Sequence, residues 1–159
     1  MKRVIVLIVS LLLVGVILCG CSCGTAQIKR TTPDDPSKVV TVTGSCDTAK
    51  EGGNITVHCK TDMMDGTIVK LSLDSYNGTV LASKVATISK GEASASFAVE
   101  SSWSGTAYGN AVIVPNSNGN QTDEFYNKYG KKMQYIESNS LIWNTEGNII
   151  IFQSEKLEL

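Results

Sequence analysis

Residues 52–73, GGNITVHCKTDMMDGTIVKLSL, decide the fold of this 159-residue chain. Apolar and polar side chains alternate over residues 54–60 and again over residues 67–74. Successive side chains of a strand point to opposite faces of a sheet, so this period of two predicts two strands that each bury one face. Asp65-Gly66 lies between them and is typical of a turn. We therefore expect two half-buried strands joined by a turn.

The chain outside this stretch continues in short β-like runs separated by Gly, Asn, Asp and Ser. Residues 79–88 fit either one bent strand or two, and residues 106–115 are apolar on both faces, as in a central strand. Residues 141–144 and 148–155 flank Glu146-Gly147 and predict a closing hairpin. In order, the expected strands are 39–43, 54–60, 67–74, 79–88, 93–99, 106–115, 141–144 and 148–155. This pattern favours an all-β fold, an immunoglobulin-like or fibronectin-III-like β-sandwich.

One short helix is predicted near residues 122–130. Thr122 suits an N-cap, and Asp123-Glu124 favours the positive end of the helix dipole. Phe125 and Tyr129 are four residues apart and share a face, and Gly130 suits the end of the helix.

This helix lies in the most aromatic part of the sequence, and Phe125, Tyr126 and Tyr129 are candidates for a binding patch. In the alternative, Phe125 and Tyr129 attach the helix to the sandwich and Trp143 fills the core.

The N-terminal 23 residues have the parts of a secretory signal. Lys2-Arg3 is followed by an apolar run at residues 4–18, and Leu18-Cys19-Gly20-Cys21 resembles the lipobox of prokaryotic lipoproteins. We expect a lipoprotein signal peptide at residues 1–20 and diacylglycerol on the Cys21 thiol, with Cys23 as the alternative acceptor. An uncleaved transmembrane anchor also remains open, because about 20 apolar residues span a bilayer. Both interpretations place the rest of the chain outside the cytoplasmic membrane.

The segment after the signal peptide contains Pro33 and Pro36 and has no periodicity, so residues 21–37 are expected to form the lipidated N-terminus and a flexible tether. The sandwich is then residues 38–159, close to the membrane. Without Lys2 and Arg3 the chain has 12 basic and 15 acidic side chains. Since no basic cluster is longer than Lys131-Lys132, we expect no nucleic-acid partner.

Two of the five cysteines, Cys46 and Cys59, belong to the expected sandwich. Disulfides persist in extracytoplasmic compartments, so these two are a possible pair. If Cys46 lies in the loop of a simple hairpin, however, Cys59 is about five residues down the next strand, farther than the roughly 7 Å that a disulfide allows between Cα atoms. Two separate thiols are the alternative.

His58 is the only histidine of the chain, and its strand position points it outward and away from Cys59. A local Cys–His catalytic pair is therefore not expected, and no nucleophile-elbow or zinc-protease motif occurs. Residues 116–124 carry mostly neutral amides, which suit calcium poorly. We expect no metal, no cofactor and no catalytic residues.

Three further segments carry a resemblance: NGTVLASKVATISKGEASASF at residues 77–97, WSGTAYGNAVIVPN at 103–116 and QTDEFYNKYGKK at 121–132. Together with the lipobox, the polar tether and residues 52–73, they make the chain similar to small immunoglobulin-like lipoproteins of Gram-positive bacteria. This resemblance implies a sandwich on a lipid anchor, mostly in proteins of unassigned function, and it implies no catalytic residues.

We therefore expect a non-catalytic lipoprotein anchored to the outer face of the cell membrane, with an unknown protein or envelope polymer as partner. A protease-inhibitor-like or protective surface lipoprotein, using residues 116–121 as its loop, is the alternative. A small hydrolase using His58 is a third.

Overall fold

Both strands expected within residues 52–73 are present, as β3 (Asn54–Thr61) and β4 (Ile68–Ser75). The computed structural model describes residues 33–116, 120–142, 144 and 147–159. In chain order, the other elements are β1 (Val40–Thr41), β2 (Gly44–Glu51), β5 (Val80–Thr87), β6 (Glu92–Ala98), β7 (Thr106–Ile113), α1 (Asp123–Tyr129), β8 (Ile136–Glu137), β9 (Leu141–Ile142), β10 (Ile149–Gln153) and β11 (Leu157–Glu158). A short 3-10 turn at Pro36–Lys38 precedes β1.

The larger sheet has the strand order β5-β4-β7-β10-β9, and β11 also pairs with β7. All of its pairings are antiparallel. Strand β7 is central, as predicted for residues 106–115, and it buries Asn110 on one face as well as Ala111 and Ile113 on the other. The closing hairpin is formed by β9 and β10. Residues 79–88 contain one strand, β5, whose pairing with β4 is irregular at Leu73/Asp74.

The smaller sheet has the order β2-β3-β6. Strands β2 and β3 form a hairpin in which Gly44 lies opposite Thr61 and Glu51 lies opposite Asn54. Gly52-Gly53 makes the two-residue turn with φ angles of 54° and 81°, which favour glycine. The sequence predicts no strand at residues 44–51, and that interpretation is wrong. It fails because β2 is an edge strand with a single fully buried side chain, so hydrophobic alternation does not mark it.

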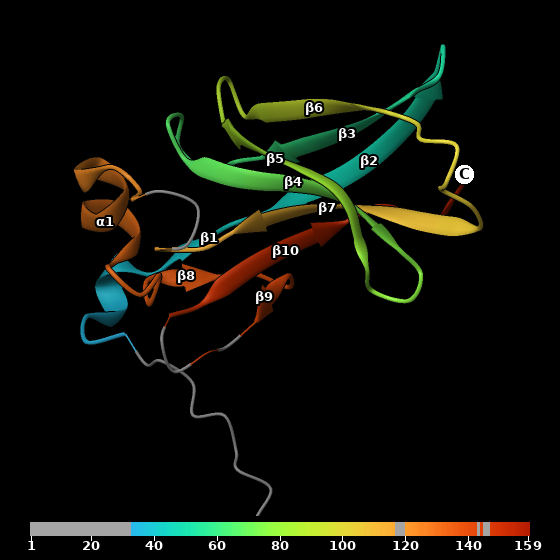
Figure 1. Ribbon diagram of the computed structural model, residues 1–159. Coiled ribbons are helices and arrows are strands. Elements are labelled where there is room, and N and C mark those ends of the chain that lie inside the picture. Colours follow the sequence, from blue (N-terminus) through green and yellow to red (C-terminus); the bar gives the residue numbers. More distant parts are fainter. Residues whose placement is uncertain (1–32, 117–119, 143, 145–146) are drawn as a thin grey trace, which may run out of the picture.

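The two sheets stack as the layers of a sandwich, with β2, β3 and β6 above β4, β7 and β10 in Figure 1. Their inner faces bury the alternating apolar residues of both predicted strands, which are Ile55, Val57, Cys59, Val69, Leu71 and Leu73. The sheets approach closely at Gly109 of β7, where a Cβ atom would lie 2.5 Å from Cγ2 of Thr48 in β2. Glycine is required there because any side chain would push the layers apart.

Helix α1 lies at one end of the sandwich, at the left in Figure 1. It begins as predicted, with Thr122 Oγ1 accepting a hydrogen bond of 3.2 Å from Phe125 N. It ends at Gly130, whose N–H donates to Tyr126 O. Near the same end, β1 and β8 form a parallel pair, with Val40 opposite Ile136.

Among the described residues, 50% lie in strands and 8% in helices, which places this part of the chain in the all-β class. The expected all-β fold with one short helix is thus confirmed for the described residues, and the architecture is β-sandwich-like. The predicted strand at 39–43 is shorter than expected, because the chain leaves β1 after Thr41 and enters the other sheet at Gly44.

Candidate functional site

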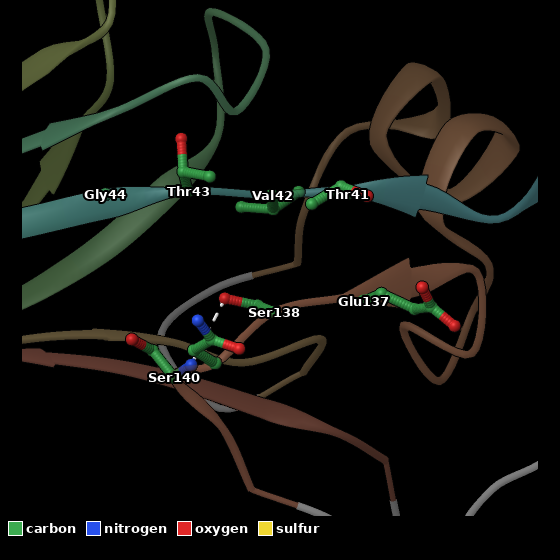
Figure 2. Close-up of a pocket in the computed structure, with 8 residues that line it drawn as sticks. Thr41, Val42, Thr43, Gly44, Glu137, Ser138 and Ser140 are labelled. Atoms are coloured by element: carbon green, nitrogen blue, oxygen red, sulfur yellow. Dashed lines mark hydrogen bonds between the residues drawn. The ribbon is translucent and has the colours of Figure 1, made fainter.

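A groove opens where β1 and β8 part (Figure 2). The last backbone bond between these strands runs from Val42 N to Glu137 O, at 2.8 Å. At the next residue, Thr43, the chain already pairs with β3, since Asp62 N donates to Thr43 O at 3.2 Å. The other strand turns away toward β9. The groove is about 420 Å³ and is lined by Thr41, Val42, Thr43, Gly44, Glu137, Ser138, Asn139 and Ser140.

The Thr43 wall of the groove is held by side chains that follow β3. The Asp62 carboxylate accepts hydrogen bonds from Thr43 N at 2.8 Å and from Thr43 Oγ1 at 2.9 Å. Thr61 Oγ1 donates to Thr43 O at 2.7 Å. Four hydrogen bonds therefore fix this residue at the point where the chain changes sheets, counting the backbone bond from Asp62.

The opposite wall is a turn attached to the larger sheet. Ser140 N donates to Ser138 Oγ at 3.3 Å, and Leu141 N donates to Ser138 O at 3.3 Å. Ile151 N in β10 donates to Ser140 O at 3.0 Å. Both walls are thus preformed, as is usual for ligand sites.

The lining of the groove is polar. Hydroxyl groups come from both walls, Asn139 adds an amide, and Glu137 adds a carboxylate, whereas the one apolar side chain, Val42, is buried. Gly44 has no room for a side chain, since a Cβ atom there would lie 2.5 Å from Cζ of the buried Phe152. Such a surface is suited to a ligand with many hydroxyl or amide groups, and it offers little apolar area.

A shallower hollow of about 590 Å³ shares Thr43 and Gly44 with the groove. Its rim carries Lys60, Lys90 and Glu92. The candidate site therefore has charged groups of both signs on one side of Thr43-Gly44 and hydroxyl groups on the other.

His58 lies beside this hollow, on the outer face of β3. Its Nε2 is 3.6 Å from Glu92 Oε2, and Lys60 Nζ is 3.6 Å from Glu92 Oε1. Its neighbour Cys59 is fully buried on the other face. The ring is partly exposed and lies beside the surface ion pair of Lys60 and Glu92, an arrangement that needs no catalytic role. Within the described ranges, no group of three or more His, Cys, Asp or Glu side chains could hold a metal ion.

Of the predicted aromatic patch, Phe125 and Tyr129 are buried, at 0% and 1% exposure. Their rings make an edge-on contact with centroids 5.0 Å apart, and the Tyr129 hydroxyl accepts a hydrogen bond from Met64 N at 2.9 Å. Tyr126 is partly buried and donates to Pro115 O at 2.8 Å. Phe125 and Tyr129 therefore attach the helix to the sandwich, as in the alternative interpretation. Trp143, its third member, lies outside the described residues.

Gln121 has a structural role that the sequence did not reveal. Its Oε1 accepts from Ile68 N at 2.8 Å, and its Nε2 donates to Ile68 O at 2.9 Å and to Val114 O at 3.1 Å. The side-chain amide continues the hydrogen bonding between β4 and β7 beyond the end of β7. Because a glutamine in a polar loop looks like a solvent-exposed residue, only the fold could show this.

Cys46 and Cys59 are both buried and both free thiols in this structure. The distance argument from the sequence applied to a Cys46 in a hairpin loop. In the structure, Cys46 lies in β2, directly opposite Cys59 in β3. Burial is the main cause that raises the pKa of the Cys46 thiol to about 12 and that of the Cys59 thiol to about 11.

The predicted acylation site, Cys21, and its alternative, Cys23, lie outside the described residues, as does most of the tether. Asp34, near the end of the tether, is held in place, since Tyr135 donates a hydrogen bond of 2.6 Å to its Oδ1. This bond lowers the pKa of Asp34 and raises that of Tyr135. None of the described helices has the length and apolar character to cross a membrane.

No protein-family model matches this chain, and no curated protein matches its sequence.

Proposed function

We propose that this protein is a non-catalytic lipoprotein, anchored outside the cell membrane through Cys21, whose immunoglobulin-like sandwich binds a hydroxyl-rich envelope polymer in the groove between β1 and β8. The observation that carries the proposal is the preformed groove, which has hydroxyl side chains on both walls and an amide and a carboxylate on the wall of residues 137–140. The lipobox at residues 18–21 supports the anchor.

The strand order supports an immunoglobulin-like type of sandwich. An immunoglobulin constant domain places its first, second and fifth strands in one sheet and its third, sixth and seventh in the other. The seven longer strands here are β2, β3, β4, β5, β6, β7 and β10. When they are counted in this order, the first, second and fifth (β2, β3 and β6) form the smaller sheet, and the third, sixth and seventh (β4, β7 and β10) lie in the larger sheet. The fourth strand, β5, pairs with the third rather than the fifth, which favours the fibronectin-III-like form.

The position of the groove supports a ligand near the membrane. Thr41 follows Cys21 by twenty residues, and the chain is already attached to the sandwich at Asp34. The twelve residues 22–33 between Cys21 and Asp34 reach roughly 45 Å even when fully extended. A lipid-anchored sandwich would therefore meet polymers next to the bilayer and could not cross a thick wall.

Mass spectrometry of the mature protein, extracted from membranes of the parent cells with detergent, tests the anchor. We expect an N-terminus at Cys21 with an added diacylglycerol, and we expect Cys21→Ser to release the protein from the membrane fraction. Cys23→Ser is the matched control and should leave it membrane-bound. An intact Met1 would favour the transmembrane alternative.

Binding of the same full-length protein to purified envelope polysaccharide tests the groove. Asn139→Ala and Thr41→Ala each remove one hydrogen-bonding side chain from the lining, and each should weaken binding about two- to tenfold. Thr56→Ala, on the outer face of β3, is the control and should bind like the parent protein. If no envelope polysaccharide binds, or if the groove variants bind normally, the groove is not the ligand site.

The protease-inhibitor alternative has one structural observation in its favour. Both ends of the loop at residues 116–121 are fixed, Asn116 by the Tyr126 hydroxyl at 3.2 Å and Gln121 by its bonds to β4 and β7. An inhibitory loop needs such a rigid base. Replacing the loop with Gly-Ser should abolish inhibition of an exported protease while leaving polysaccharide binding unchanged.

A further inference from the structure

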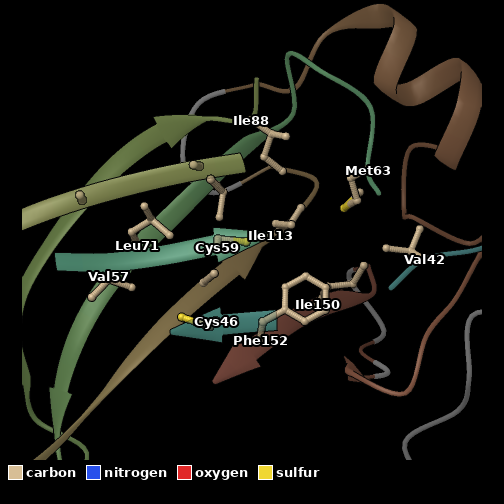
Figure 3. Close-up of a cluster of buried hydrophobic side chains, with 14 of the residues drawn as sticks. Val42, Cys46, Val57, Cys59, Met63, Leu71, Ile88, Ile113, Ile150 and Phe152 are labelled. Atoms are coloured by element: carbon tan, nitrogen blue, oxygen red, sulfur yellow. The ribbon is translucent and has the colours of Figure 1, made fainter. Parts of the chain in front are cut away.

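Cys46 and Cys59 lie directly opposite each other on two neighbouring antiparallel strands. The two residues are register partners in β2 and β3, and both side chains point into the core, with 4% and 0% exposure. Figure 3 shows them in the same cluster of buried side chains, on adjacent strands. The distance objection raised by the sequence therefore disappears, because Cys46 is opposite Cys59 and not in a hairpin loop.

The backbone hydrogen bonds identify which kind of pair this is. Asp62 N donates to Thr43 O, so Thr43 and Asp62 form a hydrogen-bonded pair. Hydrogen-bonded and non-hydrogen-bonded pairs alternate along an antiparallel ladder, so the pair Cys46/Cys59, three positions further on, is non-hydrogen-bonded.

The opposite edge of β3 gives the same result. Thr61 N donates to Gly91 O at 2.9 Å, toward the β6 side. Cys59 is two residues from Thr61, so its backbone groups also point toward β6 and away from β2. Non-hydrogen-bonded partners have Cα atoms about 4.5 Å apart, inside the range of about 4.4–6.8 Å that disulfides require. The Cα spacing of such a pair is therefore compatible with a disulfide.

We propose that Cys46 and Cys59 form a disulfide in the mature protein, and that this bond fastens edge strand β2, and with it the Thr43-Gly44 wall of the groove, to β3. This disulfide extends the proposed function, and it rests on that function only for the oxidising, extracytoplasmic location of the protein.

The bond matters because β2, although fully paired with β3, has few side chains buried in the core. Its burial pattern shows one fully buried side chain, that of Cys46, in a strand of eight residues. Cys46 follows Gly44 by two residues, so the covalent link acts next to the groove. The bond closes a short loop around the Gly52-Gly53 turn, and such loops gain stability because the unfolded chain loses freedom.

The chemistry is thiol–disulfide exchange with a disulfide-carrying oxidoreductase as the oxidant. One cysteine thiolate attacks the disulfide of that protein and forms a mixed disulfide, and the second cysteine then displaces the oxidoreductase. Two S–H bonds are lost, one S–S bond forms, and the oxidoreductase leaves as a dithiol that has taken up the two electrons and two protons. Because both thiols are buried and keep their protons at neutral pH in the closed sandwich, the exchange takes place while the β2–β3 hairpin is still accessible.

The experiment is a differential alkylation of the full-length protein in its parent cells. Cells are quenched in acid, free thiols are blocked under denaturing conditions, and new thiols are labelled with a second reagent after reduction. Peptide mapping by mass spectrometry then reads Cys46 and Cys59 separately from the cysteines at positions 19–23. We expect both residues to carry only the second label, and a Cys46–Cys59 linked peptide to appear without reduction.

The consequences of the bond are measured on the detergent-extracted protein. Reduction should lower Tm by about 5–15 °C. The double variant Cys46→Ala/Cys59→Ala should have a Tm that no longer responds to reductant. First-label alkylation of either cysteine, or a link from either one to Cys23, would overturn the proposal.

These outcomes are distinguishable from failure of the proposed function. If the protein carries the lipid on Cys21 but Cys46 and Cys59 are free thiols, the disulfide alone is rejected. A Cys46–Cys59 link in a protein that binds no envelope polysaccharide rejects the groove alone.

Discussion

The two sheets have similar inner faces and different outer faces. Inside, β3 and β4 each bury an alternating row of apolar side chains. Outside, the smaller sheet exposes small and charged groups such as Ser45, Lys60 and Glu92, whereas the larger sheet buries polar side chains on its outer face, among them Ser72 and Asn110. The outer face of the larger sheet is thus partly buried along β4 and β7, whereas that of the smaller sheet is mostly exposed.

Hydrogen bonds between side chains account for the outer face of the larger sheet. Asn110 Nδ2 in β7 donates to Asp74 Oδ2 in β4 at 2.8 Å, and Gln153 Nε2 in β10 donates to Asn110 Oδ1 at 3.1 Å. This ladder crosses three strands and satisfies groups that would otherwise be buried without partners. The larger sheet therefore carries a hydrogen-bonded frame of side chains on its outer face, whereas the smaller sheet, with its weakly buried edge strand β2, exposes small and charged groups on that face.

The largest expected effects come from the inner faces and should be alike in both sheets. Leu71→Ala in β4 and Ile55→Ala in β3 each truncate a side chain with 0% exposure. Each should lower the free energy of unfolding by about 2–5 kcal/mol, because a cavity is left as well as a lost apolar contact. Chemical denaturation measures this. An effect below 1 kcal/mol in only one sheet would show that the two inner faces do not contribute equally to stability.

The next largest effect should differ between the outer faces of the two sheets, in the free energy of unfolding lost when a polar side chain is removed. Asn110→Ala leaves the Asp74 carboxylate without its hydrogen-bond donor, and Asp74 Oδ1 already has no partner among the described residues. The expected cost is about 1–3 kcal/mol in the free energy of unfolding. The matched variant on the smaller sheet, Ser94→Ala on the outer face of β6, should cost less than about 0.5 kcal/mol. Equal losses would show that the two outer faces do not differ.

A pH dependence should arise on the inner face of the smaller sheet. Burial raises the pKa values of Cys46 and Cys59 to about 12 and about 11, above the unfolded value of about 8.5. For the reduced protein, the stability associated with the neutral thiols is therefore fully present below about pH 8.5 and is lost as the pH rises toward the folded-state values. We expect a loss of about 1 kcal/mol or more by pH 10 in urea titrations of the reduced protein. The double variant Cys46→Ala/Cys59→Ala and the oxidised protein should lack this loss.

The smallest effect is expected for the charges on the outer face of the smaller sheet. Glu92 lies 3.6 Å from both His58 and Lys60, and its side chain is 54% exposed. Glu92→Gln should change the free energy of unfolding by less than about 0.5 kcal/mol, because solvent screens exposed ion pairs. A larger loss in thermal denaturation would mean that this face is also part of the frame.

The accuracy of sequence-based prediction depends on how regularly each strand buries its side chains, in both sheets. Strands β3, β4 and β7 could be predicted because their apolar residues alternate or fill both faces. Helix α1 could be predicted from Thr122, the following acids and Gly130. Strand β2 could not, because a polar edge strand with one buried residue has no hydrophobic period. The two-residue strands β8 and β11 are too short to carry a period at all.

The candidate site was missed for a related reason. Its residues Thr41, Thr43, Ser138 and Ser140 come from two polar segments about a hundred positions apart, and neither segment carries a recognisable motif. The site exists because a parallel pair of strands ends at Val42 and its two members enter different sheets. The disulfide geometry was missed because it depends on β2, the strand that the sequence did not reveal.

The sequence alone therefore determined the all-β class, the face of each regular strand that is buried, and the ends of the helix. These properties are local: they follow from the alternation of side chains along one strand or from the chemistry of a single helix end. Only the tertiary structure decided that Cys46 faces Cys59, that Gln121 extends the pairing of β4 and β7, and that β1 and β8 part to form a groove. The reason is that strand partners and registers are set by burying surfaces that are distant in the chain, and a period of two says which face is buried without saying against what.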